Sequence, residues 1–133
     1  MRYLLDTNIV SDLVRTPNGP AARNIMRVGE ANVWTSVVVA SELRYGVENK
    51  RSAALTKQVD AVLSVIKILP LAQPVDVNYG RVRALLERRG QMIGANDLLI
   101  AAHAISESAI LVTDNLSEFE RIDELTCENW LRR

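Results

Sequence analysis

Short apolar runs alternate along this chain with longer amphipathic segments. A run of a few apolar residues between turn signals is typical of a buried strand, and apolar positions three and four apart indicate a helix. Strands are therefore predicted at residues 3–5, 33–35, 68–69 and 109–112, with a weaker one near 125–127. Helices are predicted at residues 9–15, 20–28, 36–48, 53–65, 74–89 and 97–106, and a short turn or helix at 116–121.

Several helix boundaries carry local signals. Pro20 and Pro74 stand where helices are predicted to begin, and Gly29 and Gly90 stand where they end. These are the positions that proline and glycine favour at helix termini. Asn96 is predicted to cap the helix that begins at residue 97.

Strands that alternate with helices predict a parallel sheet covered by helices on both faces. The chain of 133 residues has the length of one domain, so the expected architecture is a single three-layer α/β/α domain. Ligands of such sheets bind beyond the carboxyl ends of the strands. Residues at strand ends and helix starts are therefore the first candidates for a functional site.

Composition narrows the class of protein. Sixteen basic and sixteen acidic residues give zero formal net charge, which argues against a protein held on nucleic acid by charge alone. Cys127 is the only cysteine, so no intrachain disulfide can form, and Asp6 interrupts the N-terminal apolar run too early for a secretory signal. No apolar run approaches the ~18 residues of a membrane span. We expect a cytoplasmic protein.

Carboxylates occupy the positions where the predicted fold would place a site. Asp6 follows the first strand, Asp114 follows the strand at 109–112, Asp97 begins a helix, and Glu42 lies within one. Each acid has a structural alternative, because Asp6 and Asp114 can cap the helices that follow them and Asp97 can complement a helix dipole.

The helical neighbours of Glu42 and Asp97 weaken that alternative. Residues three and four apart share a helix face. On this spacing neither acid has a basic neighbour, whereas Glu48 has Arg44 and Arg51. An acid on a largely apolar face needs a cation or another polar partner from elsewhere in the fold. If the acids converge, an oxygen-only cluster suits Mg²⁺ or Mn²⁺ rather than Zn²⁺.

Four segments, in this order and at these separations, resemble the PIN-domain ribonuclease toxins of the VapC type. They are Leu4-Leu5-Asp6-Thr7-Asn8, Ser41-Glu42-Leu43-Arg44-Tyr45-Gly46, residues 93–104 around Asn96-Asp97, and Leu111-Val112-Thr113-Asp114-Asn115 followed by Glu118-Phe119-Glu120-Arg121. The resemblance covers nearly the whole chain.

The resemblance implies a PIN-like fold, Mg²⁺-dependent RNA cleavage (in some relatives of transfer RNA), dimerisation, and inhibition by a cognate antitoxin. It gives Asp6, Glu42 and Asp97 the three main acidic positions, with Asp6 and Asp97 as the direct metal ligands. Asn8 would help to orient the site. The fourth position stays open, because many relatives have their polar residue two places after the Thr, at Asn115, whereas Asp114 is one place earlier. Both residues remain candidates.

Three other interpretations compete with this one. A phosphate-receiving signalling domain would need paired acids after the first strand and a late Lys, but no Lys follows Lys67. A phosphatase would need a second acid where Asn8 stands. The third is a catalytically inactive PIN module that binds RNA or an antitoxin. His103 and Cys127 are expected to have packing roles, and the arginines at positions 81, 83, 88 and 89 either guide RNA or solvate a helix face.

Overall fold

A computed structural model, which describes residues 1–132, contains one five-stranded sheet. Its strands follow the order β3-β2-β1-β4-β5, and every neighbouring pair is parallel. The strands are β1 (Tyr3–Leu5), β2 (Val33–Ser36), β3 (Lys67–Leu69), β4 (Ile110–Val112) and β5 (Cys127–Glu128). The predicted parallel sheet is confirmed, and β1 lies at its centre.

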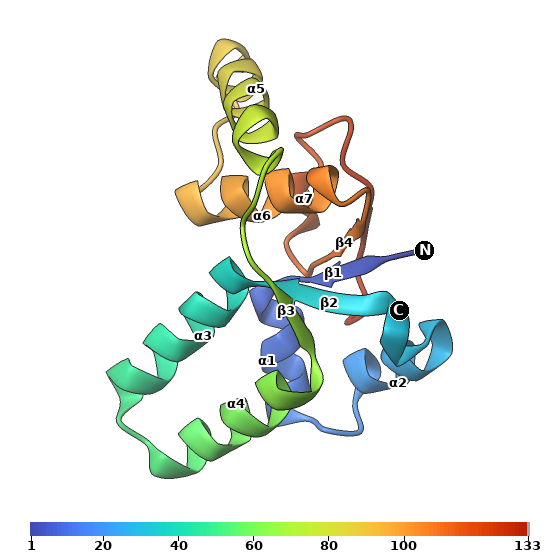
Figure 1. Ribbon diagram of the computed structural model, residues 1–133, viewed down its shortest axis with the longest axis vertical. Coiled ribbons are helices and arrows are strands. Elements are labelled where there is room, and N and C mark those ends of the chain that lie inside the picture. The colour runs from blue at the N-terminus through green and yellow to red at the C-terminus, as the bar shows by residue number, and fades with distance from the viewer. Residues whose placement is uncertain (133) are drawn as a thin grey trace.

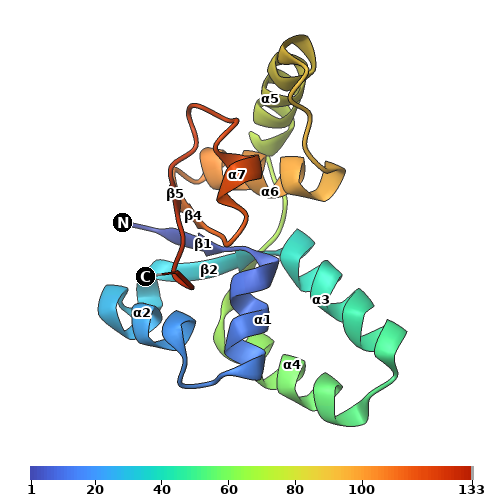
Figure 2. The same cartoon turned by 180° about the vertical axis from the view of Figure 1, so that it is seen from behind.

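Helices cover both faces of the sheet (Figure 1, and from behind Figure 2). One group of helices, from α1 to α4, lies on one side of the sheet, and a second group, from α5 to α7, lies on the other. The first group is α1 (Thr7–Arg15), α2 (Pro20–Val28), a 3-10 turn (Glu30–Asn32), α3 (Val37–Lys50) and α4 (Ala53–Val65). The second is α5 (Val75–Arg89), α6 (Ala95–Ser106) and α7 (Leu116–Phe119). The three-layer α/β/α architecture is therefore confirmed.

The two central strands explain why both faces must be covered. All residues of β1 and β4 are buried, and Leu4, Leu5, Leu111 and Val112 have no exposed surface. Side chains alternate between the faces of a strand, so each face receives apolar groups that need a helix against them.

Among residues 1–132, no helix has both the length and the apolarity to cross a bilayer.

Some predicted boundaries are wrong by one or two residues. Helix α1 begins at Thr7 instead of residue 9, because the Asp6 carboxylate accepts the Thr7 N–H and starts the helix earlier. Asn96 does not cap α6. That helix begins at Ala95, and the N–H of the preceding Gly94 donates to the carboxylate of Glu118, a partner 24 residues away. Local sequence contains no signal for such a partner.

Candidate active site

The carboxyl edge of the sheet brings Asp6 and Thr113 together. Strands β1 and β4 are paired in register, Leu5 against Val112, so the residues that follow them lie side by side. The Thr113 hydroxyl donates to Asp6 Oδ2 at 2.7 Å, and the Asp6 N–H donates to the Val112 carbonyl at 2.9 Å. Asp6 is only 4% exposed. Its position is therefore fixed by both central strands.

Asn8 ties the same two strand ends together. Its amide nitrogen lies 3.4 Å from Asp6 Oδ2 and 3.5 Å from Thr113 Oγ1. Its amide oxygen accepts the N–H of Asp114 at 2.9 Å. The side chain thus holds the start of α1 against the end of β4 while it contacts the Asp6 carboxylate.

Glu42 reaches this edge from α3. The Ser36 hydroxyl accepts the Val38 N–H and caps that helix directly after β2. Glu42 then faces the start of α1, where the Thr7 hydroxyl donates to Glu42 Oε1 at 2.6 Å. Glu42 lies on a largely apolar helix face and was therefore expected to have a polar partner from elsewhere in the fold. That partner is the Thr7 hydroxyl, 35 residues away in the sequence.

Asp97 lies beside Glu118, which sequence reasoning did not single out. A Cβ built on Gly94 would lie 3.5 Å from Asp97 Oδ2 and 3.9 Å from Glu118 Oε1, so both carboxylates flank this glycine. Glu118 accepts the Gly94 N–H at 2.9 Å and the Asn115 amide at 2.7 Å. The available signal was its place one turn after Asn115, within the segment that carries the family resemblance.

The clustered negative charge shifts the pKa values of these acids. The pKa of Asp97 rises to about 7, first because of burial and then because of Glu118, Asp6 and Glu42. Burial also raises the pKa of Asp6, with a smaller contribution from Glu42, against the opposing hydrogen bonds of Thr113 and Thr7. For Glu118, burial raises the pKa, but the hydrogen bonds from Gly94, Asp97 and Asn115, together with the nearby charge of Arg121, prevail and lower it. Asp97 and Glu118 therefore lie close enough to share a hydrogen bond through one proton.

Asp114 does not join this cluster in the structure. Its carboxylate accepts hydrogen bonds from Asn129 at 2.8 Å and Arg132 at 3.1 Å, and these partners lower its pKa. Asn115 instead contacts the cluster through Glu118. Of the four predicted acids, the structure brings Asp6, Glu42 and Asp97 to one edge, whereas the Asp114 carboxylate binds Asn129 and Arg132.

The structure indicates packing or surface roles for the other residues considered from sequence. His103 is buried, its Nδ1 lies 2.9 Å from Ser36 Oγ, and its ring meets Trp34 edge-on. Burial raises the pKa of Cys127 to about 11, so its thiol stays protonated. Three of the four α5 arginines, at positions 81, 83 and 89, pair with surface acids. These pairs favour a solvated helix face for that cluster.

The acidic edge fits a hard divalent cation. Its donors are all carboxylate oxygens, and within residues 1–132 no Lys or Arg hydrogen-bonds to Asp6, Glu42, Asp97 or Glu118. In the same range no three His, Cys, Asp or Glu side chains already stand close enough to enclose one ion. Mg²⁺ keeps several of its waters and needs only one or two carboxylates. An open cluster of carboxylates therefore suits Mg²⁺ better than it suits Zn²⁺.

Comparison with known proteins identifies the family to which this fold and its acidic edge belong. A family model described as "PIN domain" matches residues 3–125, so the α/β/α layers and the acidic edge are those of a PIN domain. The chain is 39% identical over 132 residues to Ribonuclease VapC2 of Rickettsia felis, which covers 98% of both chains. It is 33% identical over 132 residues, again 98% of both chains, to the tRNA(fMet)-specific endonuclease VapC of Shigella flexneri.

A solved structure agrees with the sequence relatives. The structure of VapBC2 from Rickettsia felis, bound to a DNA fragment from its promoter, contains a chain that superposes with a TM-score of 0.90. Its sequence identity is 38%, and the match covers 98% of this chain and 99% of the other. This protein belongs to the VapC family of PIN-domain ribonucleases.

Proposed function

We propose that this protein is a Mg²⁺-dependent endoribonuclease and the toxin of a toxin–antitoxin pair. The observation that carries the proposal is the convergence of Asp6, Glu42, Asp97 and Glu118, to which no Lys or Arg among residues 1–132 donates a hydrogen bond. Burial and the neighbouring carboxylates raise the pKa of Asp97 to about 7. A cluster with this unbalanced charge favours binding a cation, and family membership supplies the class of reaction.

Asp6 and Asp97 would hold the metal directly, and Glu42 and Glu118 would hold its waters. A bound Mg²⁺, or Mn²⁺ in its place, supplies an activated water and offsets the charge that develops on a phosphodiester. The chain's own residues position these acids. Thr113 and Asn8 fix the Asp6 carboxylate, and other hydrogen bonds fix the remaining acids.

The proposed substrate is RNA, and transfer RNA is the first candidate because the Shigella flexneri relative is named for that activity. The proposed inhibitor is an antitoxin encoded beside this chain, by analogy with the VapBC2 assembly of Rickettsia felis. We also expect the active protein to be a homodimer, as the family resemblance implies.

The test is cleavage of unfractionated transfer RNA with Mg²⁺, with and without excess EDTA. Wild type should cut only with the metal, and Asp97→Asn and Glu42→Gln should lose most of the rate. Glu48→Gln is the matched control, because Glu48 is exposed on the same helix as Glu42. Binding of the metal should also stabilise the wild-type fold, by about 2.7 kcal/mol at a hundredfold excess over Kd.

Undiminished cleavage in EDTA by clean protein would overturn the metal mechanism. RNA binding without cleavage, under either Mg²⁺ or Mn²⁺, would instead favour the catalytically inactive PIN module. The thermal measurement separates the two cases, because it reports metal binding whether or not RNA is cut.

A further inference from the structure

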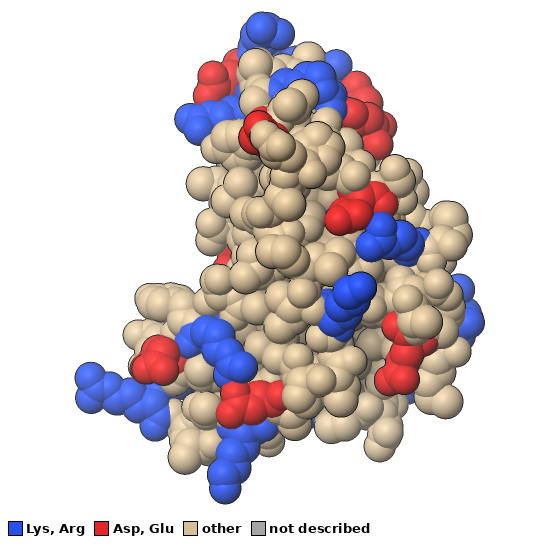
Figure 3. Space-filling model, in the orientation of Figure 1, with Lys and Arg blue, Asp and Glu red and all other residues tan. Residues whose placement is uncertain are grey.

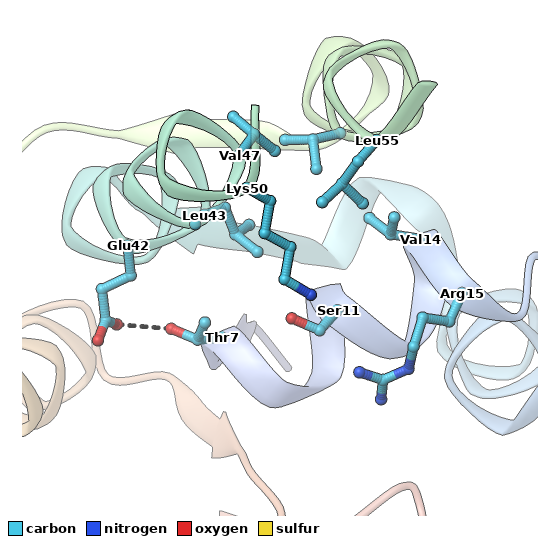
Figure 4. A pocket seen from close by; sticks show the side chains of 11 residues that line it. Thr7, Ser11, Val14, Arg15, Glu42, Leu43, Val47, Lys50 and Leu55 are labelled. Atoms are coloured by element: carbon cyan, nitrogen blue, oxygen red, sulfur yellow. Dashed lines mark hydrogen bonds between the residues drawn. The ribbon is translucent and has the colours of Figure 1, made fainter. Parts of the chain in front are cut away.

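A cavity of about 230 Å³ adjoins the acidic edge (Figure 4). Helices α1 and α3 diverge as they leave the sheet, and α4 lies across their far ends (Figure 2). The hydrogen-bonded pair of Thr7 and Glu42 lines one end of the cavity. The cavity is therefore continuous with the proposed active site and extends away from it along two helices.

Two matching stripes of residues form its polar sides. On α1 the stripe is Thr7, Ser11 and Arg15, and on α3 it is Glu42, Gly46 and Lys50. Both repeat every four residues, so each stripe lies on one helix face. The stripes change character along their length. They begin with the Thr7–Glu42 pair and end with two cations. The cavity's other lining residues are apolar: Val14, Leu43, Val47, Leu55 and Val59.

The two cations have no partner among residues 1–132. Arg44, Arg81 and Arg89 all pair with surface carboxylates. No hydrogen bond or ion pair in that range involves the side chain of Arg15 or Lys50. Figure 4 shows Lys50 extending toward Ser11 and Arg15 turning to the same side. Gly46 leaves the opening clear, because a Cβ placed there would meet nothing within 4 Å.

The separation of the cations from the acids suits a polyanion. Eight residues of helix, from Thr7 to Arg15, span about 12 Å along the axis. The backbone of Arg15 is therefore farther from the acidic end than the screening length of about 8 Å at physiological salt. RNA would meet negative charge at the acids, and the net charge of the chain is zero. Acids and bases are also interspersed on the face that Figure 3 shows. Attraction must then come from local cations.

We propose that this cavity is a nucleotide subsite for RNA, beside the phosphodiester that is cleaved. Lys50 and Arg15 bind a neighbouring backbone phosphate, the Ser11 hydroxyl donates to it, and the apolar wall receives the attached sugar or base. The proposal rests on the proposed ribonuclease function, since it assigns a second contact to the same substrate. Lys50 and Arg15 are positioning residues and do not touch the reacting phosphorus.

The test uses an RNA stem–loop with the anticodon-loop sequence of initiator transfer RNA and the full chain with Mg²⁺. Lys50→Ala and Arg15→Ala should each lower kcat/KM about tenfold, mainly by raising KM. The slope of log affinity against log salt should become shallower by about 0.7, because each variant neutralises one phosphate fewer. Lys57→Ala and Arg88→Ala are matched controls, because both side chains are exposed and lie outside the cavity.

A second measurement locates the contact. Neutral methylphosphonate linkages are placed singly along the stem–loop, and kcat/KM is measured for each. At one position next to the cut, wild type should lose about tenfold, while the Arg15→Ala/Lys50→Ala double variant should lose nothing further. A merely structural role for the two cations would give the double variant the same loss as wild type at every position.

The outcomes separate the two proposals. If wild type neither binds nor cuts this stem–loop or unfractionated transfer RNA, the proposed function fails and the subsite fails with it. If wild type cuts RNA and the cavity variants match their controls, the subsite alone is wrong. If those variants keep wild-type RNA kinetics but weaken inhibition by the neighbour-encoded antitoxin, the cavity receives an acidic peptide and the RNA assignment is overturned.

Discussion

Replacing Asp97 by Asn should stabilise the metal-free protein at alkaline pH while it removes most of the cleavage activity. In the folded protein the pKa of Asp97 rises to about 7 from the ordinary value of 3.8. The neutral side chain is thus favoured, and ionisation above pH 7 places a charge among Glu118, Asp6 and Glu42. An asparagine keeps the shape, can donate to Glu118 as the protonated acid does, and never ionises.

The magnitude follows from the shift in pKa. The rise of the Asp97 pKa from 3.8 to about 7 corresponds to about 4 kcal/mol if it were fully retained. Asp97 is only half-buried, so solvent screening reduces this to about 1–2 kcal/mol. For a domain of this size, that change in the free energy of unfolding raises Tm by about 4–8 °C.

The sign depends on pH. A carboxyl group whose folded pKa is raised binds more protons when folded, so its contribution to stability is present below pH 4 and is lost as pH rises to about 7. Wild type and Asp97→Asn should therefore melt together at pH 4 in EDTA. They should separate between pH 4 and 7, and the variant should melt higher at pH 8.

Calorimetry in EDTA at pH 4, 6 and 8 tests this expectation, with Glu48→Gln as the exposed control. Adding Mg²⁺ at pH 8 should raise the Tm of wild type and leave that of Asp97→Asn nearly unchanged. If Asp97→Asn melts below wild type at pH 8 in EDTA, the acidic cluster is not under electrostatic strain and the reasoning from its pKa is refuted.

Two further predictions concern the neighbours of the cluster. Asp114→Ala should reduce the cleavage rate far less than Glu118→Gln, because the Asp114 carboxylate binds Asn129 whereas Glu118 lies in the cluster. Cleavage rates are measured at saturating Mg²⁺. The opposite order of the two variants would show that Asp114 belongs to the cluster. Thr113→Val removes a hydrogen bond that lowers the pKa of Asp6, so the acidic limb of the pH–rate profile should move to higher pH; an unchanged profile would contradict this role.

The sequence predicted the layers of the fold because they depend on local patterns. Strands β1 and β4 are short apolar runs, and each is followed directly by a polar residue that the parallel sheet carries to one edge. Strand-end reasoning led to Asp6, which the structure brings to that edge, and to Asp114, whose carboxylate binds Asn129 and Arg132 instead. Glu42 and Asp97 were found by another pattern, the lack of basic neighbours on their helix faces. Their roles stay predictions until the variants are measured.

Glu118 and Asn96 show where local reasoning fails. Glu118 stands three residues before Arg121, which is the spacing of an ordinary surface acid, and it becomes part of the cluster only because α6 begins beside it. Asn96 is a good capping residue by type, but the capping contact of α6 comes from Glu118. Both errors arise from one contact between α6 and α7, and no pattern within either segment encodes it.

The start of three helices at the same sheet edge explains how the fold tolerates its acids without a metal. Helices α1, α3 and α6 all begin there, and their free N–H groups carry partial positive charge. The Thr7 N–H contacts Asp6, and the Gly94 N–H contacts Glu118. Each such contact contributes about 0.3–1 kcal/mol, whereas two carboxylates at about 4 Å repel by about 4 kcal/mol near a protein surface. The helix ends therefore lessen the repulsion without cancelling it, and the charge that is left over is what a divalent cation can neutralise.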